Sequence, residues 1–270
     1  MNIYHQIARK DCLSHQLWPH FKKGWPETDK IVHFFWGLGD AQTEDIRQCI
    51  KKKEEWWFVD TGYITEQITR YPSPIIHDPN KTYFRIIKGG LHTIRGKVGD
   101  GKRLNKLRSQ GIDVDFKGWY AGETKHILLC PSSPTVTYHI NGISQQDWIN
   151  QVTAELKKYT KREIRVRNKP RPGNQWWNKS IKEDLKNCHC LVTNMSMAAI
   201  DAVLNKVPVI THNMNVASPV SGRDLAKIEK PLKPGRETIR EWLQFVVENQ
   251  FTMTEINKGV AYKTLMEQQV

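Results

Sequence analysis

The stretch CHCLVTNMSMAAIDAVLNKVPVIT, from Cys188 to Thr211, predicts the fold class of this chain. Residues 190–192 form a short apolar run with the length of a buried strand, and residues 207–210 form a second one. Between them lie a polar turn at 193–196 and a helical pattern at 197–204, in which Ala, Ile and Val share one face. A strand, a capped helix and a strand in so short a stretch make a βαβ unit of a parallel sheet.

Such a unit places a helix N-terminus at the carboxyl edge of the sheet. Unpaired backbone N–H groups and the positive end of the helix dipole collect there, and both favour a phosphate group. An ordinary Rossmann-like unit with a structural cap shows the same pattern. For a single βαβ unit that plainer interpretation is favoured by roughly two to one.

Two further strands of the second half end in polar residues. The apolar run at 126–130 is followed by Ser132 and Ser133, and the run at 163–167 ends in Arg167 and is followed by Lys169. Because the carboxyl ends of parallel strands meet at one edge, we expect these ends to lie beside the turn that carries Asn194. Cations, hydroxyls and a helix N-terminus together predict a diphosphate site.

The first half repeats the α/β pattern and supplies candidate acid–base groups. A strand at 31–36 ends in a glycine turn before Asp40, and a strand at 56–59 ends at Asp60. A carboxylate at the end of a parallel strand points toward the crevice where α/β proteins bind ligands, although a turn-capping Asp is equally compatible with this position. We expect Asp60, and after it Asp40, to act as a general base.

Several motifs resemble those of known enzymes. Asn194–Ala199, Asp201–Ala202 and residues 205–210 resemble the donor-binding segment of GT-B nucleotide-sugar glycosyltransferases. The resemblance implies that Ser196, Met197 and Ala198 contact the diphosphate and that Asp201 contacts the ribose. That family usually has Glu at the ribose position and Gly before the next strand, where this chain has Asp201 and Lys206.

Phage-encoded glycosyltransferases share further motifs with this chain, in the same order. These are D-x-G-Y at 60–63, P-S-S at 131–133, IRVRNKP at 164–170 and QFTMTEINKG at 250–259. The resemblance extends over residues 31–265 as scattered motifs. It implies two Rossmann-like α/β domains with parallel sheets facing a central cleft. We therefore expect an N-terminal acceptor-side domain at 1–122, a nucleotide-sugar domain at 123–235, and helices at 236–270 that pack back on the first domain.

The chain is strongly basic, with 41 Lys and Arg against 28 Asp and Glu and a net charge of +13. Much of the excess lies between residues 81 and 108, where five glycines interrupt the basic residues. This pattern is typical of a loop or ribbon facing phosphates, although a solvated lysine surface is also common. The candidate DNA contacts are Arg85, Lys88, Arg95, Lys97, Lys102 and Arg103.

These patterns predict a glycosyltransferase that uses a nucleotide sugar, expected to be a UDP-sugar, with a 5-hydroxymethylpyrimidine of phage DNA as acceptor. Transfer to a surface polysaccharide, a non-catalytic DNA-binding role and a sugar-nucleotide epimerase stay open as alternatives. Cations and a helix dipole can stabilise the leaving group, so no metal or other obligatory cofactor is expected. The five scattered Cys residues and the lack of a long apolar run favour a reduced cytoplasmic protein away from the membrane.

Overall fold

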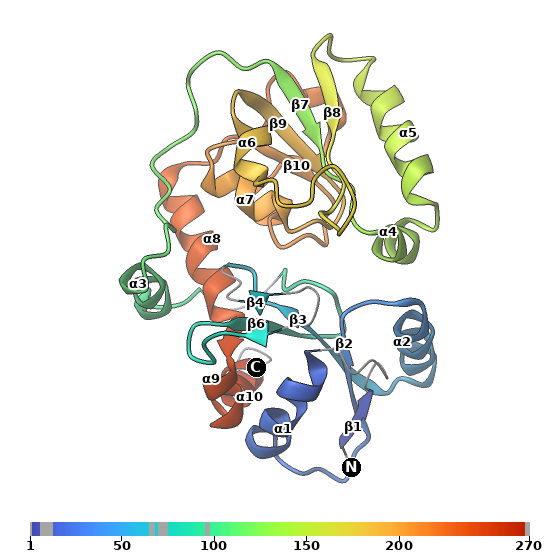
Figure 1. Ribbon diagram of the computed structural model, residues 1–270, viewed down its shortest axis with the longest axis vertical. Helices are drawn as coiled ribbons and strands as arrows, with labels where there is room; N and C mark the ends of the chain where they lie inside the picture. Colours follow the sequence, from blue (N-terminus) through green and yellow to red (C-terminus); the bar gives the residue numbers. More distant parts are fainter. Residues whose placement is uncertain (1, 6–12, 65–67, 70–74, 95–97, 268–270) are drawn as a thin grey trace. The chain divides into compact units, whose positions relative to one another are not determined.

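The computed structural model describes residues 2–5, 13–64, 68–69, 75–94 and 98–267 (Figure 1). The chain divides into two compact units. Unit 1 contains residues 1–113 and 244–270, and unit 2 contains residues 114–243. These limits, at 113/114 and 243/244, differ from the limits at 122 and 235 that the sequence pattern predicts. Among the described residues, no helix is both long enough and apolar enough to cross a bilayer.

The sheet of unit 1 has five strands in the order β1-β2-β3-β6-β11. Strands β1 (Asn2–His5), β2 (Val32–Trp36) and β3 (Glu55–Thr61) are parallel, whereas β6 (Tyr83–Lys88) runs antiparallel to β3 and β11 (Gln250–Thr252) antiparallel to β6. The expected parallel sheet is therefore wrong for this unit. A parallel neighbour requires a crossover connection, and the described part of the β3–β6 connection contains a short ribbon, β4 (Ile68–Thr69) with β5 (Ile75–Ile76), instead of a helix.

An aromatic cluster forms the core of unit 1. The ring of Trp25 lies 5.2–5.3 Å from the rings of Phe21, Phe34, Trp57 and Tyr262. The helices of this unit are α1 (Ser14–Gly24), α2 (Asp40–Lys52), α3 (Lys102–Ser109), the last turn of α8 (Arg236–Glu248), α9 (Met253–Asn257) and α10 (Val260–Glu267).

Helix α1 approaches α9 so closely that its last residue must be Gly24. A Cβ atom there would lie 1.7 Å from the carbonyl oxygen of Ile256. This contact joins the N-terminal and C-terminal segments of unit 1.

The sheet of unit 2 is entirely parallel, as expected, with the order β10-β9-β7-β8. Its strands are β7 (His126–Leu129), β8 (Glu163–Val166), β9 (Cys188–Thr193) and β10 (Val209–Thr211). The connecting helices are α4 (Pro134–Asn141), α5 (Gln145–Leu156), α6 (Ile181–Leu185) and α7 (Ala198–Leu204), and two 3₁₀ turns follow at Ser218–Val220 and Leu225–Lys227. The sequence pattern did not reveal α4.

The strand order of unit 2 reverses once. From β7 the chain passes through α5 to β8 on one side, and then returns through α6 to β9 on the other side of β7. Side chains of α5 pack on the sheet face that carries Ile127 and Val192. Right-handed crossovers place α6 and α7 on the opposite face. The point of reversal lies between β7 and β9, which is where open α/β sheets bind their ligands.

The basic segment at 81–108 is more ordered than the expected loop or ribbon. Its first part forms β6, the fourth strand of the mixed sheet between β3 and β11, and its last part forms α3. Leu104 and Leu107 of α3 are buried, so the basic residues of the helix occupy the other faces of an amphipathic surface helix. The expectation of a loop is therefore wrong where α3 forms, whereas the apolar residues at 83–87 have the pattern of a strand and form β6.

Candidate functional site

The loops that follow β7 and β9 are joined by side-chain hydrogen bonds at the point of strand reversal. The backbone N–H of Ser132 donates to Oδ1 of Asn194 at 2.9 Å, and the backbone N–H of Met195 donates to Oγ of Ser132 at 3.0 Å. Ser132 and Asn194 are 5% and 2% exposed. Two of the three strand ends predicted to meet are thus in direct contact, and neutral groups make that contact.

The side chain of Asn194 extends this contact into helix α4. Its Nδ2 donates to Oδ1 of Asn141 at 3.0 Å and to Oγ1 of Thr137 at 3.3 Å. The backbone carbonyl oxygen of Asn194 accepts from Oγ1 of Thr211 at 2.8 Å and from Nδ2 of Asn215 at 3.3 Å, which brings in the end of β10. We call these residues the switch-point network: Ser132, Thr137, Asn141, Asn194, Thr211 and Asn215.

Four members of the switch-point network were missed in the sequence: Thr137, Asn141, Thr211 and Asn215. Thr137 and Asn141 lie on α4, which the pattern did not predict, while Thr211 ends β10 and Asn215 lies in the loop after it. The usable signal was weak: Thr211 directly follows an apolar run, and short polar side chains there bond readily to nearby backbone, but no local pattern marks the other three.

The start of α7 holds the other residues predicted to contact a diphosphate. The N–H of Ser196 donates to Oγ1 of Thr193, and the N–H of Ala198 donates to Oγ of Ser196, both at 3.2 Å. Two of the backbone amides predicted to bind a phosphate therefore have hydroxyl partners. Ser196 and Met197 themselves are half-buried. Ser133 caps α4, accepting from the N–H of Val136 at 3.5 Å.

The third predicted strand end is arranged differently. Arg167 is 5% exposed, its guanidinium forms an ion pair with Asp184, and it donates to the carbonyl oxygen of Lys179 at 2.6 Å. Its charge is thus used to hold the chain before and within α6. Lys169 and Asp201 are both exposed. The structure therefore joins the ends of β7, β9 and β10 into one network, and leaves the Arg167 side chain outside it.

A histidine that the sequence analysis did not consider follows β10. Nδ1 of His212 accepts from the N–H of Met214 at 3.3 Å, so the neutral ring carries its proton on Nε2. Partial burial and the nearby Arg223 lower the pKa of His212 below its ordinary value. The side chain is therefore a neutral hydrogen-bond donor at the carboxyl edge of the unit 2 sheet.

The candidate bases of unit 1 lie near the carboxyl ends of the neighbouring parallel strands β2 and β3. Oδ2 of Asp60 accepts from Arg85 at 2.8 Å and Oδ1 from the N–H of Thr61 at 2.7 Å, so both carboxylate oxygens have partners. Asp40 begins helix α2 and is exposed. Asp40 therefore has the more accessible carboxylate, whereas Asp60 belongs to an ion pair with a buried arginine.

Arg85 lies directly opposite Asp60 in the antiparallel register and is 6% exposed. Its second amino group donates to the carbonyl oxygen of Thr61 at 2.7 Å, and its guanidinium carbon lies 5.5 Å and 5.6 Å from the ring centres of Phe58 and Tyr63. This predicted DNA contact faces inward.

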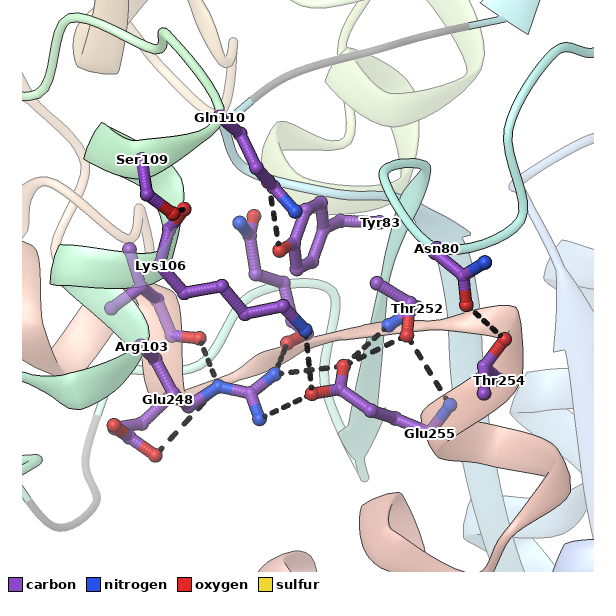
Figure 2. Close-up of polar contacts among 12 residues, drawn as sticks. Asn80, Tyr83, Arg103, Lys106, Ser109, Gln110, Glu248, Thr252, Thr254 and Glu255 are labelled. Atoms are coloured by element: carbon purple, nitrogen blue, oxygen red, sulfur yellow. Dashed lines mark hydrogen bonds and ion pairs between the residues drawn. The ribbon is translucent and has the colours of Figure 1, made fainter.

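A second ion-pair cluster surrounds Arg103 on helix α3 (Figure 2). Its guanidinium donates to Oε1 of Glu255 at 3.0 Å, reaches Glu248 at 3.8 Å and lies 5.0 Å from the ring centre of Phe251. Lys106 joins the same carboxylate of Glu255 at 3.5 Å. The cluster links α3 to the C-terminal segment that carries β11 and α9.

The remaining predicted DNA contacts are closer to solvent. Lys88 pairs with Glu55 at 3.0 Å and Lys102 pairs with Asp100 at 2.6 Å. Arg95 and Lys97 lie outside the described residues. Each described candidate in the basic segment thus has an acidic partner within unit 1, which reduces the net charge that the segment presents.

Comparison with known proteins finds a structural neighbour but no family. No protein-family model and no curated protein matches the chain. Among solved structures, the chain is similar to KpsC of Thermosulfurimonas dismutans, a beta Kdo 2,4 transferase, with 11% sequence identity and a TM-score of 0.46. The similarity covers 89% of this chain and 97% of that chain.

Proposed function

We propose that this protein is a glycosyltransferase and that unit 2 binds its nucleotide-sugar donor beside the switch-point network. The observation that carries the proposal is the contact of Ser132 with Asn194 at the reversal point of an all-parallel sheet. Ligands of open α/β sheets bind outside the strand ends at this point. The donor-like motif at 194–210 supplies the second argument, because it begins with this same Asn194.

In this proposal the buried switch-point network positions the site, and half-buried residues beside the network contact the donor. These half-buried residues are Ser133, Ser196 and Met197, and His212 offers an N–H at the end of the neighbouring strand. Such groups stabilise the negative charge that grows on a diphosphate leaving group, so the chemistry needs no metal. Asp201 is assigned to the ribose hydroxyls and Lys169 to a phosphate, while Arg167 acts as a positioning residue through Asp184.

Donor binding is tested first, with UDP-sugars and the nucleoside diphosphate as probes in calorimetry. Asp201→Asn and Lys169→Ala change exposed side chains, so both variants should stay folded. Each should weaken binding by about tenfold or more, the value of one hydrogen bond to a charged group. Lys158→Ala, which changes an exposed lysine of the same unit, is the matched control. If no nucleotide sugar binds the wild type, the proposal is wrong.

The proposed acceptor class follows from the charge of the chain. The net charge of +13 favours a polyanion, and we propose a 5-hydroxymethylpyrimidine of DNA. An enzyme that acts on such a base would have to expose it from the duplex. The second candidate, a surface polysaccharide, is favoured by the inward pairing of Arg85 and Arg103.

Transfer is tested by incubating a panel of UDP-sugars with hydroxymethylated DNA or with polysaccharide acceptors, followed by mass spectrometry of the products. Sugar on the nucleoside supports the first acceptor, and sugar on the polysaccharide supports the second. A protein that binds DNA but neither binds nor transfers a sugar would be the non-catalytic alternative. Asp40→Asn is the cleaner test of a general base, because Asp60→Asn also leaves Arg85 without its partner.

A further inference from the structure

Three side chains of unit 1 that are separated in the sequence bring a nitrogen, a sulfur and an oxygen together. They are His33 on β2, Cys49 on α2, and Glu54 in the turn before β3. Their potential ligand atoms all lie within 4.8 Å of one another, and Nε2 of His33 lies 3.1 Å from Oε2 of Glu54. We propose that these residues form a zinc-binding site, independent of the nucleotide-sugar site proposed for unit 2.

The donor set indicates the metal. Imidazole nitrogen, thiolate sulfur and carboxylate oxygen are the three ligand types of zinc, whereas magnesium and calcium prefer oxygen alone. Zinc–ligand bonds of 2.0–2.3 Å in a tetrahedron require ligand atoms about 3.3–3.8 Å apart. The His33–Glu54 pair, at 3.1 Å, is already slightly closer than this, and a pair at the 4.8 Å limit would have to contract by about 1 Å, which small side-chain rotations allow.

The surroundings of the cluster suit a cation. His33 and Cys49 are 8% and 3% exposed, while Glu54 is half-buried and leaves one side open to solvent. The ring of Phe35 stacks parallel to that of His33 at 6.1 Å, which restrains the imidazole. Asp45, one helical turn before Cys49, adds a further negative charge.

The position of the cluster assigns the metal a structural role. His33 is the second residue of β2 and Glu54 directly precedes β3, so the site lies at the amino ends of two parallel strands. Asp60 lies at the carboxyl end of β3, and Asp40 begins the helix after the carboxyl end of β2. A metal here would fasten the C-terminal part of α2 to the sheet. No sequence motif marks this site, because the three ligands come from three elements at irregular spacing.

The test uses the full chain, freed of metal by a chelator. One sample is titrated with zinc, and a separate sample is titrated with cobalt as a spectroscopic probe. We expect one equivalent to bind, with a thiolate-to-cobalt charge-transfer band and a rise in the unfolding temperature of unit 1. Cys49→Ala should lose the band. Cys188→Ala, which removes a buried thiol of unit 2, should keep it.

Two outcomes would overturn the proposal: a wild type that binds no stoichiometric zinc or cobalt, and a Cys49→Ala protein that binds them like the wild type. If Cys49→Ala does not fold, Glu54→Gln decides, because it changes a half-buried side chain at the edge of the cluster. Glu54→Gln should weaken zinc binding while the apoprotein unfolds at the wild-type temperature. Equal zinc affinity of Glu54→Gln and wild type would then exclude the site.

Discussion

The two units differ in the polar contacts that join the ends and neighbours of their strands. Unit 1 uses ion pairs, with Arg85 facing Asp60 and Arg103 facing Glu255. Unit 2 joins its strand ends through neutral amides and hydroxyls, centred on Asn194. Arginines of a basic segment can therefore form ion pairs inside a unit instead of facing solvent. Uncharged residues such as Ser132 and Asn194 can join several strand ends by hydrogen bonds alone.

The sheet topology explains this difference. In unit 1 the antiparallel turn back to β6 sets Arg85 directly across from Asp60, and β11 then brings the C-terminal segment against β6. In unit 2 every connection crosses over to a parallel strand, so the loops after β7, β9 and β10 return to the same edge. Short polar side chains can bridge such adjacent loops without any charge.

The largest expected effect comes from removing one charge of the buried ion pair. Asp60→Asn keeps the shape of the side chain but leaves the Arg85 guanidinium without a counter-charge, which should cost about 3–5 kcal/mol. Hydrogen-exchange mass spectrometry should show faster exchange in β3 and β6, with unit 2 unchanged. Asp40→Asn, which changes an exposed carboxylate, should leave this exchange as in the wild type.

A smaller effect is expected at the neutral network. Asn194→Ala removes the partner of the Ser132 N–H and the donor to Asn141, and should cost about 1–3 kcal/mol. Faster exchange should appear in β7 and β9, and it should depend little on salt because no ion is involved. A loss as large as that of Asp60→Asn would mean that neutral and ionic clusters constrain their units equally.

Acid should weaken unit 1 through Glu255. Burial alone would raise the pKa of this carboxyl, but Arg103, the N–H of Thr252 and Lys106 together hold the pKa below its ordinary value of 4.5. The stabilisation is therefore complete above the ordinary pKa and is lost as the pH falls through the lower, folded-state pKa.

This pH dependence can be measured as the unfolding midpoint of unit 1 between about pH 6 and about pH 3. Arg103→Met should raise the pKa of Glu255 and flatten the acid-induced loss relative to the wild type. Lys51→Met changes an exposed lysine of helix α2 in the same unit, and it should leave the profile unchanged. An Arg103→Met profile that superimposes on the wild type would show that the guanidinium does not set this carboxyl's charge.

The features that the sequence predicted correctly depend on neighbouring residues. The apolar runs around Val59, Leu128 and Leu191 are strands, and the polar residues after them are strand ends. The α/β class and the parallel sheet of unit 2 followed from the same short-range signals. The antiparallel direction of β6 did not, because it depends on pairing with β3 and β11, whose residues are far away in the chain.

The candidate site shows the same division. Ser132 and Asn194 were predicted to meet because parallel strand ends converge, and they do meet. Whether a cation points to solvent depends on its partners, and the partners of Arg167 and Arg103 lie 17 and 152 positions away. The number of charges along the chain contains no information about such pairs. The burial and the partner of each arginine could therefore not be predicted from the sequence.

The smallest expected effect compares one helix cap from each unit. Ser144 caps α5 in unit 2, accepting from the N–H of Asp147 at 3.0 Å, and Thr252 caps α9 in unit 1 within a box closed by Glu255. Ser144→Ala should cost about 1 kcal/mol, the usual value of an exposed cap. Thr252→Ala should cost more, since Thr252 is 1% exposed and its hydroxyl bonds the carboxylate that also pairs with Arg103. Chemical denaturation of both variants measures the difference, and equal losses would show that the ion pairs of unit 1 add nothing to the cap they surround.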